Sequence, residues 1–177
     1  MTFEKLKKNI IDVIEEEQIK LGFQEETIRL YYPLQSLNLF LETEYSVEEM
    51  HKALEEFARQ EKERLGRIEI SEKGERFCIK LPKETAIYVH EKIPKNEFLC
   101  DFIALISQHG TKIEDILACF QNYSDKLHFE KVQNGEFDYL IYFEDGIPDD
   151  YRYCITDEGV HMIYHRYTKE DYKELGL

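Results

Sequence analysis

The stretch SVEEMHKALEEFARQEKERLGRIEISEKGERFCIKL, residues 46–81, changes along its length from the hydrophobic period of a helix to that of a strand. It opens with Ser46 and Glu49 at capping-box spacing, in which the Ser hydroxyl and the Glu carboxylate each accept a hydrogen bond from a backbone N–H. The helix that follows is expected to end at Gly66. Its apolar face recurs at helical spacing: Val47, Met50, Leu54, Phe57, Ala58 and Leu65.

Beyond Gly66 the apolar side chains alternate with polar ones, which is the pattern of a strand with one buried face. A turn signal around Gly74 separates two such runs, so the pair predicts a β-hairpin. The alternating positions are Ile68 and Ile70 in the first run and Phe77, Ile79 and Leu81 in the second.

Two further helices are expected upstream of this stretch. One runs from Phe3 to Leu21 and ends at Gly22, and a shorter one begins near Pro33. Three helices followed by a hairpin make the element order of residues 1–85 winged-helix-like. The third helix, which would be the recognition helix, carries more acidic than basic side chains, which argues against binding of nucleic acid. A transcriptional regulator is the alternative that rests on element order alone.

In residues 86–177, as in the first half, helices precede strands. Asn96 and Thr111 are placed to cap two helices. Four strand-like runs and a last helix then follow, at residues 127–132, 137–143, 151–156, 160–167 and 169–175. The sequence therefore predicts an α+β fold with antiparallel hairpins. Its halves, residues 1–85 and 86–177, form either two domains or one compact unit.

The composition favours a soluble, cytoplasmic protein. The formal net charge is −14, with 37 acidic and 23 basic side chains, which repels anionic lipid and phosphate backbones. No apolar run is long enough to span a bilayer, and no export signal is recognisable. The four cysteines, Cys78, Cys100, Cys119 and Cys154, lie singly, which argues against a zinc knuckle and indicates reduced thiols.

No established catalytic, cofactor or metal-binding motif occurs in the sequence, so no catalytic residue, cofactor or metal is predicted. A small-molecule or metal site, in a binding protein or an enzyme, is the alternative. It would use Cys154, His161 and His165 together with the acidic loop at residues 144–150. Two histidines four residues apart on a strand are about 13 Å apart, which disfavours joint chelation of one ion.

Tyrosine, arginine and histidine are concentrated between residues 137 and 172. These residue types anchor protein interfaces. The favoured interpretation is a non-enzymatic protein-binding module with a protein partner, whose oligomeric state the sequence leaves open. The candidate binding surface comprises Arg152, Tyr153, Cys154, His161, Tyr164, His165, Arg166 and Tyr167.

The same region carries a resemblance to a known family. The runs FDYLIYFE at residues 137–144, YRYC at 151–154 and IYHRYTKEDY at 163–172 resemble an uncharacterised bacterial family, one of the domains of unknown function. Residues 6–22 are similar to that family as well, so the resemblance extends along the whole chain. It implies a self-standing cytosolic protein and brings no activity, cofactor or catalytic residue with it.

Overall fold

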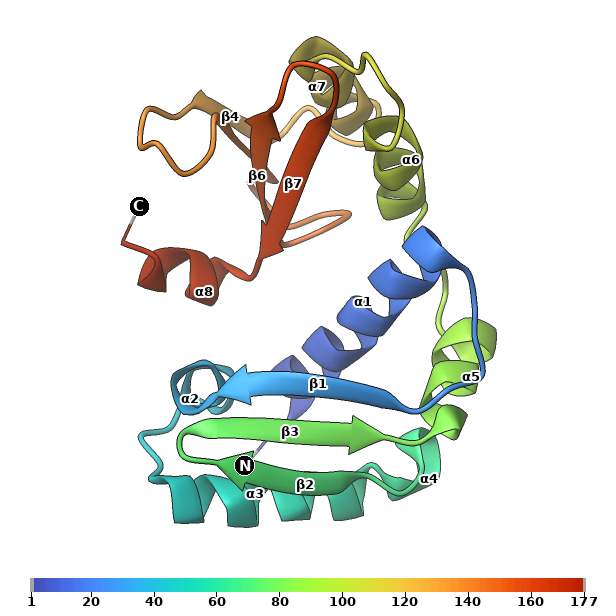
Figure 1. Ribbon diagram of the computed structural model, residues 1–177, viewed down its shortest axis with the longest axis vertical. Helices are drawn as coiled ribbons and strands as arrows, with labels where there is room; N and C mark the ends of the chain where they lie inside the picture. Colours follow the sequence, from blue (N-terminus) through green and yellow to red (C-terminus); the bar gives the residue numbers. More distant parts are fainter. Residues whose placement is uncertain (1, 177) are drawn as a thin grey trace. The chain divides into compact units, whose positions relative to one another are not determined.

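The computed structural model describes residues 2–176, which form two compact units (Figure 1). The first unit extends to Pro94 and the second begins at Lys95. Each contains helices and one antiparallel sheet, so the predicted α+β class is confirmed. None of the helices in the described part of the chain combines the length and the apolarity that crossing a bilayer requires.

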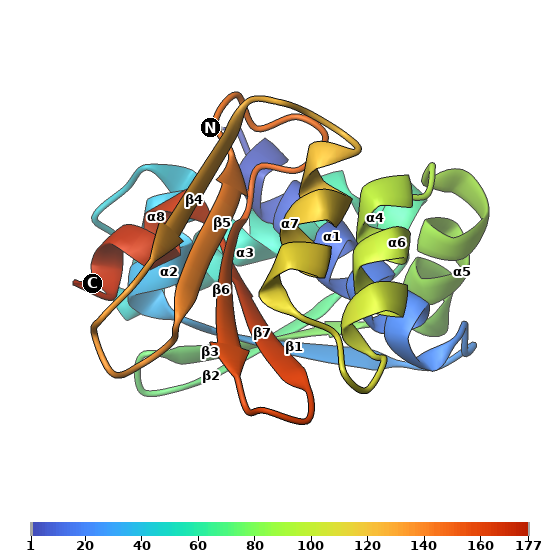
Figure 2. The same cartoon turned by 90° about the horizontal axis from the view of Figure 1, so that it is seen from above.

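The first unit is a three-stranded sheet with helices on one side. Its elements are α1 (Glu4–Leu21), β1 (Ile28–Pro33), α2 (Leu34–Leu41), α3 (Val47–Gln60), α4 (Lys62–Leu65), β2 (Glu69–Lys73), β3 (Arg76–Leu81) and α5 (Lys83–Lys92). The strand order is β1-β3-β2, with both pairs antiparallel. In Figures 1 and 2, α1 and α3 lie on the same side of this sheet.

The core of the first unit fills the space between the sheet and these helices. Every second side chain of β3 is fully buried, at Phe77, Ile79 and Leu81. The helices contribute Leu6, Ile10 and Ile14 from α1 and Met50, Leu54 and Phe57 from α3. Burial of a side chain of this kind contributes about 1.5–3 kcal/mol to folding, so this layer holds the unit together.

The capping box at the start of α3 is present as predicted. The Ser46 backbone N–H donates to the Glu49 carboxylate at 2.9 Å, and the Ser46 hydroxyl accepts from the Glu49 N–H at 3.4 Å. The helix is interrupted at Glu61, and α4 continues it to Leu65. Strand β1 and helix α5 were not predicted. The three predicted helices and the hairpin are all present, while the winged-helix likeness stays an interpretation.

Helix α5 determines where the first unit ends. It packs against α1 and α4, and the Gln18 side-chain amide donates to the Ala86 carbonyl at 3.0 Å. Thr85 is fully buried and donates to the Leu65 carbonyl at 2.5 Å. The contacts therefore divide the chain after Pro94, nine residues beyond the division after residue 85 that the order of elements suggested.

The second unit is a four-stranded meander with helices on both faces. Its elements are α6 (Glu97–Ile106), α7 (Ile113–Gln121), β4 (Leu127–Lys131), β5 (Tyr139–Phe143), β6 (Arg152–Asp157), β7 (Met162–Tyr167) and α8 (Lys169–Glu174). The strands pair in chain order, β4-β5-β6-β7. Figure 2 shows α6 and α7 on one side of the sheet and α8 on the other.

An aromatic cluster joins α6 and α7 to the sheet. The Phe98 ring lies 4.9 Å from that of Phe143 and 4.8 Å from that of Phe120, and Phe102 lies 4.9 Å from Tyr153. The edge-to-face angles at these contacts are those that aromatic quadrupoles favour. We call the sheet face under these helices the inner face and the opposite one the outer face.

The four predicted strands and the last helix are all present with shifted ends. The cap of α7 differs by one residue from the expectation. The Asp115 carboxylate accepts from the Lys112 backbone N–H at 2.9 Å, whereas the Thr111 hydroxyl donates to the carbonyl of Leu105 at 2.9 Å. Thr111 therefore closes the α6–α7 turn instead of capping the helix.

Candidate functional site

The pleat of the hairpin β6–β7 divides the predicted binding residues between the two faces of the sheet. The cross-strand pairs Arg152–Tyr167 and Cys154–His165 belong to the outer face. The pairs Tyr153–Arg166 and Ile155–Tyr164 belong to the inner face. Successive side chains of a strand point to opposite faces, so adjacent residues such as Arg152 and Tyr153 cannot share one surface.

On the inner face, Arg166 is part of a buried polar network. Its guanidinium donates to the Asp149 carboxylate at 2.8 Å, and the two side chains are only 5% and 1% exposed. The same carboxylate oxygen accepts from the Tyr153 hydroxyl at 3.0 Å and from the Asn96 amide at 3.1 Å. The second oxygen accepts from the Tyr151 N–H at 2.9 Å.

This network joins four segments of the second unit. Asn96 also caps α6, because its side-chain oxygen accepts from the Leu99 N–H at 3.1 Å. The Arg166 guanidinium lies over the Tyr151 ring at 3.9 Å. A buried ion pair whose oxygens are all hydrogen-bonded fixes geometry and offers no surface to a partner. We therefore assign Tyr153, Arg166 and Asp149 a structural role.

On the outer face, a row of polar and aromatic side chains crosses all four strands. The His128 ring stacks on Tyr142, with centroids 4.7 Å apart and planes inclined by 17°. The Arg152 guanidinium carbon lies 3.7 Å from the centroid of the same Tyr142 ring. Tyr167 is the cross-strand neighbour of Arg152. We call these four residues the outer row.

Arg152 is the arginine of the outer row, and its guanidinium lies over the Tyr142 ring. Among residues 2–176, no carboxylate lies within ion-pair distance of Arg152. His128, by contrast, contacts the Glu130 carboxylate at 3.1 Å. His165 is exposed beside the row, with its ring 6.2 Å from that of Tyr167. Stacked and partly desolvated, Arg152 keeps its hydrogen-bond donors in a fixed plane.

Apolar side chains and α8 support the row from one side. Phe137, Leu140 and Cys154 are buried, with Tyr142, Tyr167 and Tyr172 packed against them. Thr168 caps α8, and Tyr172 of that helix packs on Phe137 with ring centroids 6.4 Å apart. Burial raises the pKa of both Tyr167 and Tyr172 above the ordinary value of a tyrosine.

The thiol of Cys154 has no reactive character at neutral pH. It is 1% exposed, and burial raises its pKa to about 12. Since the thiolate is both the nucleophile and the metal ligand, Cys154 serves as a small apolar side chain in this setting.

His161 lies apart from the outer row, in the turn between β6 and β7. Its ring contacts the Glu158 carboxylate at 3.1 Å and lies 6.5 Å from the His109 ring. Within the part of the chain that the structure describes, no three His, Cys, Asp or Glu side chains converge as a metal site would need. Cys154, His161 and His165 are therefore not assembled into one centre.

The acidic loop at residues 144–150 contains two kinds of carboxylate. Asp145 is partly exposed and pairs with Lys126 at 3.4 Å, as an ordinary surface residue would. Asp149 is instead the buried acceptor of the inner-face network. The sequence shows four acidic residues in one loop and gives no sign which of them is buried.

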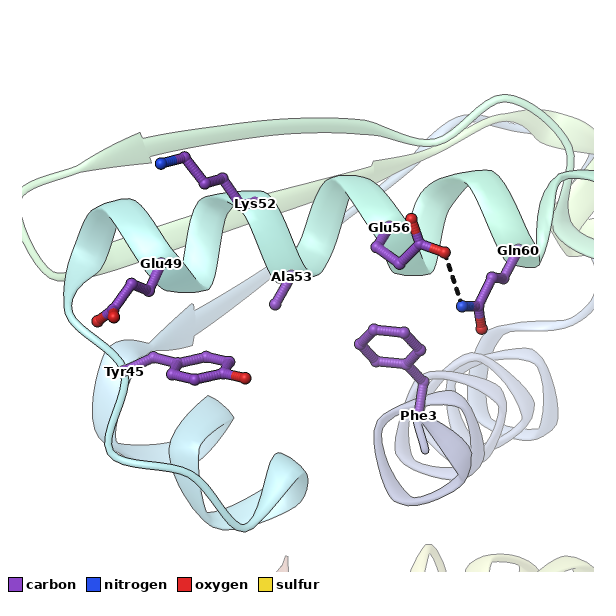
Figure 3. Close-up of a pocket in the computed structure, with 7 residues that line it drawn as sticks. All are labelled: Phe3, Tyr45, Glu49, Lys52, Ala53, Glu56 and Gln60. Atoms are coloured by element: carbon purple, nitrogen blue, oxygen red, sulfur yellow. Dashed lines mark hydrogen bonds between the residues drawn. The ribbon is translucent and has the colours of Figure 1, made fainter. Parts of the chain in front are cut away.

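The first unit contains a shallow groove of about 490 Å³ along α3. Figure 3 shows the Phe3 and Tyr45 rings on either side of Ala53. Three of its polar side chains already have partners: Lys52 with Glu48 at 2.7 Å, Gln60 with Glu56 at 2.8 Å, and Glu49 in the capping box. A ligand site needs polar groups that converge on the ligand. These three side chains are already hydrogen-bonded to protein groups, so the groove is the weaker candidate.

Two members of the outer row, His128 and Tyr142, were not among the predicted site residues. They belong to β4 and β5, while the prediction was confined to the β6–β7 hairpin. The sequence signal for Tyr142 was the alternation of side chains along residues 139–143. When the strands are in register, this alternation places Tyr142 on the same face as Arg152. Register between strands separated by long loops is not encoded locally.

Comparison with known proteins identifies the family. Residues 3–176 match the family described as "Domain of unknown function, E. rectale Gene description (DUF3877)". No curated protein and no solved structure matches the chain. The match covers nearly the whole chain and agrees with the resemblance to an uncharacterised bacterial family. The chain belongs to the DUF3877 family, a family of unknown function.

Proposed function

We propose that the protein is a non-enzymatic protein-binding module whose contact surface is the outer row together with His165. The observation that carries this proposal is the fixed stack of His128, Tyr142 and Arg152 on a sheet face. Arg and Tyr are enriched among residues that dominate binding energy at protein interfaces. A side chain held in its bound orientation loses less conformational entropy on binding, which favours such a role for Arg152.

The chemistry of the row indicates what the partner presents. A planar guanidinium recognises carboxylates bidentately, and tyrosine rings provide apolar area with a polar edge. The partner is expected to place an acidic side chain or a chain terminus on Arg152, with apolar groups against Tyr167. Four free cysteines, at residues 78, 100, 119 and 154, support placing this module in the reducing cytosol.

The test compares variants of the outer face with a matched control on the same sheet. Arg152→Glu reverses a charge at the proposed surface, and His165→Glu adds a negative charge there. Lys131→Glu makes a comparable change at an exposed position of β4 whose cross-strand neighbour, Tyr139, belongs to the inner face. Each variant is used as bait in its own cells, and retained proteins are quantified by mass spectrometry against the unaltered chain.

The proposal expects one set of proteins to be retained by the unaltered chain and by Lys131→Glu, and lost with both outer-face variants. Circular dichroism establishes that all the variants are folded. Equal retention by folded outer-face variants would contradict the assignment of the surface. Native mass spectrometry of the gently isolated protein then gives the stoichiometry of the complex.

A further inference from the structure

The exposed face of the first sheet gathers basic side chains that are scattered in the sequence. In the register of β1-β3-β2, three rows cross this face. The rows are Arg29–Lys80–Glu69, Tyr31–Cys78–Ser71 and Pro33–Arg76–Lys73. Four cations and one carboxylate give the face a net charge of +3, on a chain whose total is −14.

The burial pattern shows that this face is open to solvent. Arg29, Tyr31, Lys73 and Arg76 are exposed, and Tyr31 retains 55% of its accessible surface. The alternate residues of β3 are fully buried on the helix side. Within residues 2–94, helices α1 and α3 lie on that other side of the sheet (Figure 1).

The two acidic residues of these three strands do not cancel this charge. Glu72 lies on the helix side, where its carboxylate contacts His51 of α3 at 2.6 Å. Glu69 is the one carboxylate on the face, and Lys80 pairs with it at 2.8 Å. The hydrogen bond from Lys80 lowers the pKa of Glu69, and the charges of Arg67 and Arg29 lower it further, so these cations lie close together.

The cations form two groups with a neutral row between them. Lys80 and Arg76 are four residues apart on β3, which separates their rows by about 13 Å. Tyr31 in the neutral row is exposed, and the Arg76 guanidinium carbon lies 5.3 Å from its ring centroid. Along the strand direction, a cationic row is followed by the row with the Tyr31 ring and then by a second cationic row. The spacing of the two cationic rows matches that of acidic residues at positions i and i+4 of an extended chain.

We propose that this basic face binds an extended acidic peptide segment of a protein partner, with carboxylates at i and i+4 over the two cationic rows and a neutral side chain at i+2 against Tyr31. An extended segment directs residues i, i+2 and i+4 to the same side, so all three reach the face together. This site lies in the other unit from the outer row and does not depend on the function proposed for that row.

Charge and ring content favour a peptide over a nucleic acid. A nucleic acid is a long polyanion that extends beyond three rows of a sheet into the field of a chain with net charge −14. Sites for single strands also stack successive bases on several aromatic rings. Within the three rows, Tyr31 is the one aromatic side chain.

The test uses two fluorescent peptides of identical composition. The first contains Glu-Ser-Val-Ser-Glu, which places both carboxylates and the Val on one side. The second contains Ser-Glu-Val-Glu-Ser, which brings the carboxylates to about 7 Å apart and turns them away from the Val. Fluorescence polarisation of each is titrated with the full chain, and a single-stranded DNA oligonucleotide with the same number of charges is the third probe.

The variants distinguish binding at this face from attraction by the overall charge of the chain. Arg29→Glu and Arg76→Glu change one row each, and Lys62→Glu removes an exposed cation of α4 outside the face. The first peptide is expected to bind at least about tenfold more tightly than the second, with each face variant weakening it by about tenfold or more. Lys62→Glu is expected to leave the affinity within about twofold, because the reversed charge lies outside the contact.

Three results would overturn the proposal. Equal affinity for the two peptides would show that only net charge matters. Unchanged affinity in folded Arg29→Glu and Arg76→Glu would place binding elsewhere. Tighter binding of the oligonucleotide, lost in the same two variants, would assign the face to nucleic acid.

Discussion

The guanidinium carbon of Arg152 lies 3.7 Å from the centroid of the Tyr142 ring, on the neighbouring strand of the second sheet. His128 stacks on the same ring from β4, so Tyr142 contacts both an imidazole and a guanidinium. A cation held over an aromatic face is stabilised by about 0.5–1 kcal/mol at exposed sites. The arrangement fixes Arg152 in the plane from which it would meet a partner.

Replacing Tyr142 by Leu should weaken partner binding although no charge is changed. The substitution removes the ring under both His128 and Arg152 and keeps an apolar side chain toward Leu140. We expect the free energy of unfolding to fall by about 1–2 kcal/mol, because a large half-buried side chain becomes smaller. Arg152→Lys, which keeps the charge and loses the planar stack, should weaken capture as well. Quantitative affinity capture measures both, and full capture by Arg152→Lys would show that charge alone suffices.

Removing Asp149 should strongly destabilise the second unit. In Asp149→Ala the guanidinium of Arg166 stays buried without its carboxylate, and breaking such a pair costs about 3–5 kcal/mol. Hydrogen exchange resolved by peptide should show loss of protection in β6 and β7. Asp145→Ala, which breaks the exposed pair with Lys126, should cost less than about 1 kcal/mol.

The same pair predicts a compensating double variant. Asp149→Leu combined with Arg166→Met replaces the two charges by apolar groups and should recover most of the stability that Asp149→Ala loses. A double variant as unstable as the single one would mean that the hydrogen bonds from Asn96 and Tyr153 to Asp149 carry most of the effect.

The Cys154 thiol should resist alkylation in the folded protein at pH 8. Burial raises its pKa to about 12, so the reactive thiolate is nearly absent, while the half-buried Cys78 provides an internal comparison. Peptide mapping after iodoacetamide treatment measures both. Labelling of Cys154 as fast as that of Cys78 would contradict this assignment.

Stability should also depend on pH through Cys154. The folded state holds the thiol proton more tightly than the unfolded state, whose pKa is near 9, so this contribution is complete below pH 9. It is lost progressively as the pH rises from about 9 towards 12. Between pH 8 and pH 10 the melting temperature should fall less in Cys154→Ala than in the unaltered chain. Parallel profiles would show that the thiol does not titrate with folding.

Ser46→Ala should destabilise the start of α3. The variant removes one half of the capping box, a change that costs about 1 kcal/mol. Urea unfolding followed by circular dichroism measures the effect, and hydrogen exchange should locate it in the first turn of α3. Ser71→Ala on the exposed sheet face is the matched control and should change stability by less than about 0.5 kcal/mol.

Local sequence signals predicted the helices and hairpins well because their causes are local. The Ser46–Glu49 capping box and the alternation at Phe77, Ile79 and Leu81 each act within a few residues, and the structure contains both. Strand β1 was missed because its pairing partner, β3, lies more than forty residues away in the sequence. The alternation of Ile28, Leu30 and Tyr32 with Arg29 and Tyr31 was a local signal, but it is short and was not used in the prediction.

The candidate site was predicted only in part for the same physical reason. The predicted surface combined Arg152 and Cys154 with Tyr153, although side chains alternate along a strand, and the structure has Tyr153 on the opposite face. The burial of Asp149 could not be foreseen, because Asn96 and Arg166 come to it from distant parts of the chain. The basic face of the first sheet is likewise produced by register, which gathers residues 29, 73, 76 and 80.

Site-specific photo-crosslinking in cells can show whether the outer row is a protein contact surface. A photo-reactive phenylalanine replaces His165 beside the outer row, and in a second strain it replaces Lys131, whose neighbour Tyr139 belongs to the inner face. We expect a discrete crosslinked species from position 165, absent from position 131 and lost when Arg152→Glu is added. A folded protein that gives no crosslink from position 165, or the same products from both positions, would contradict the proposed role of the outer row.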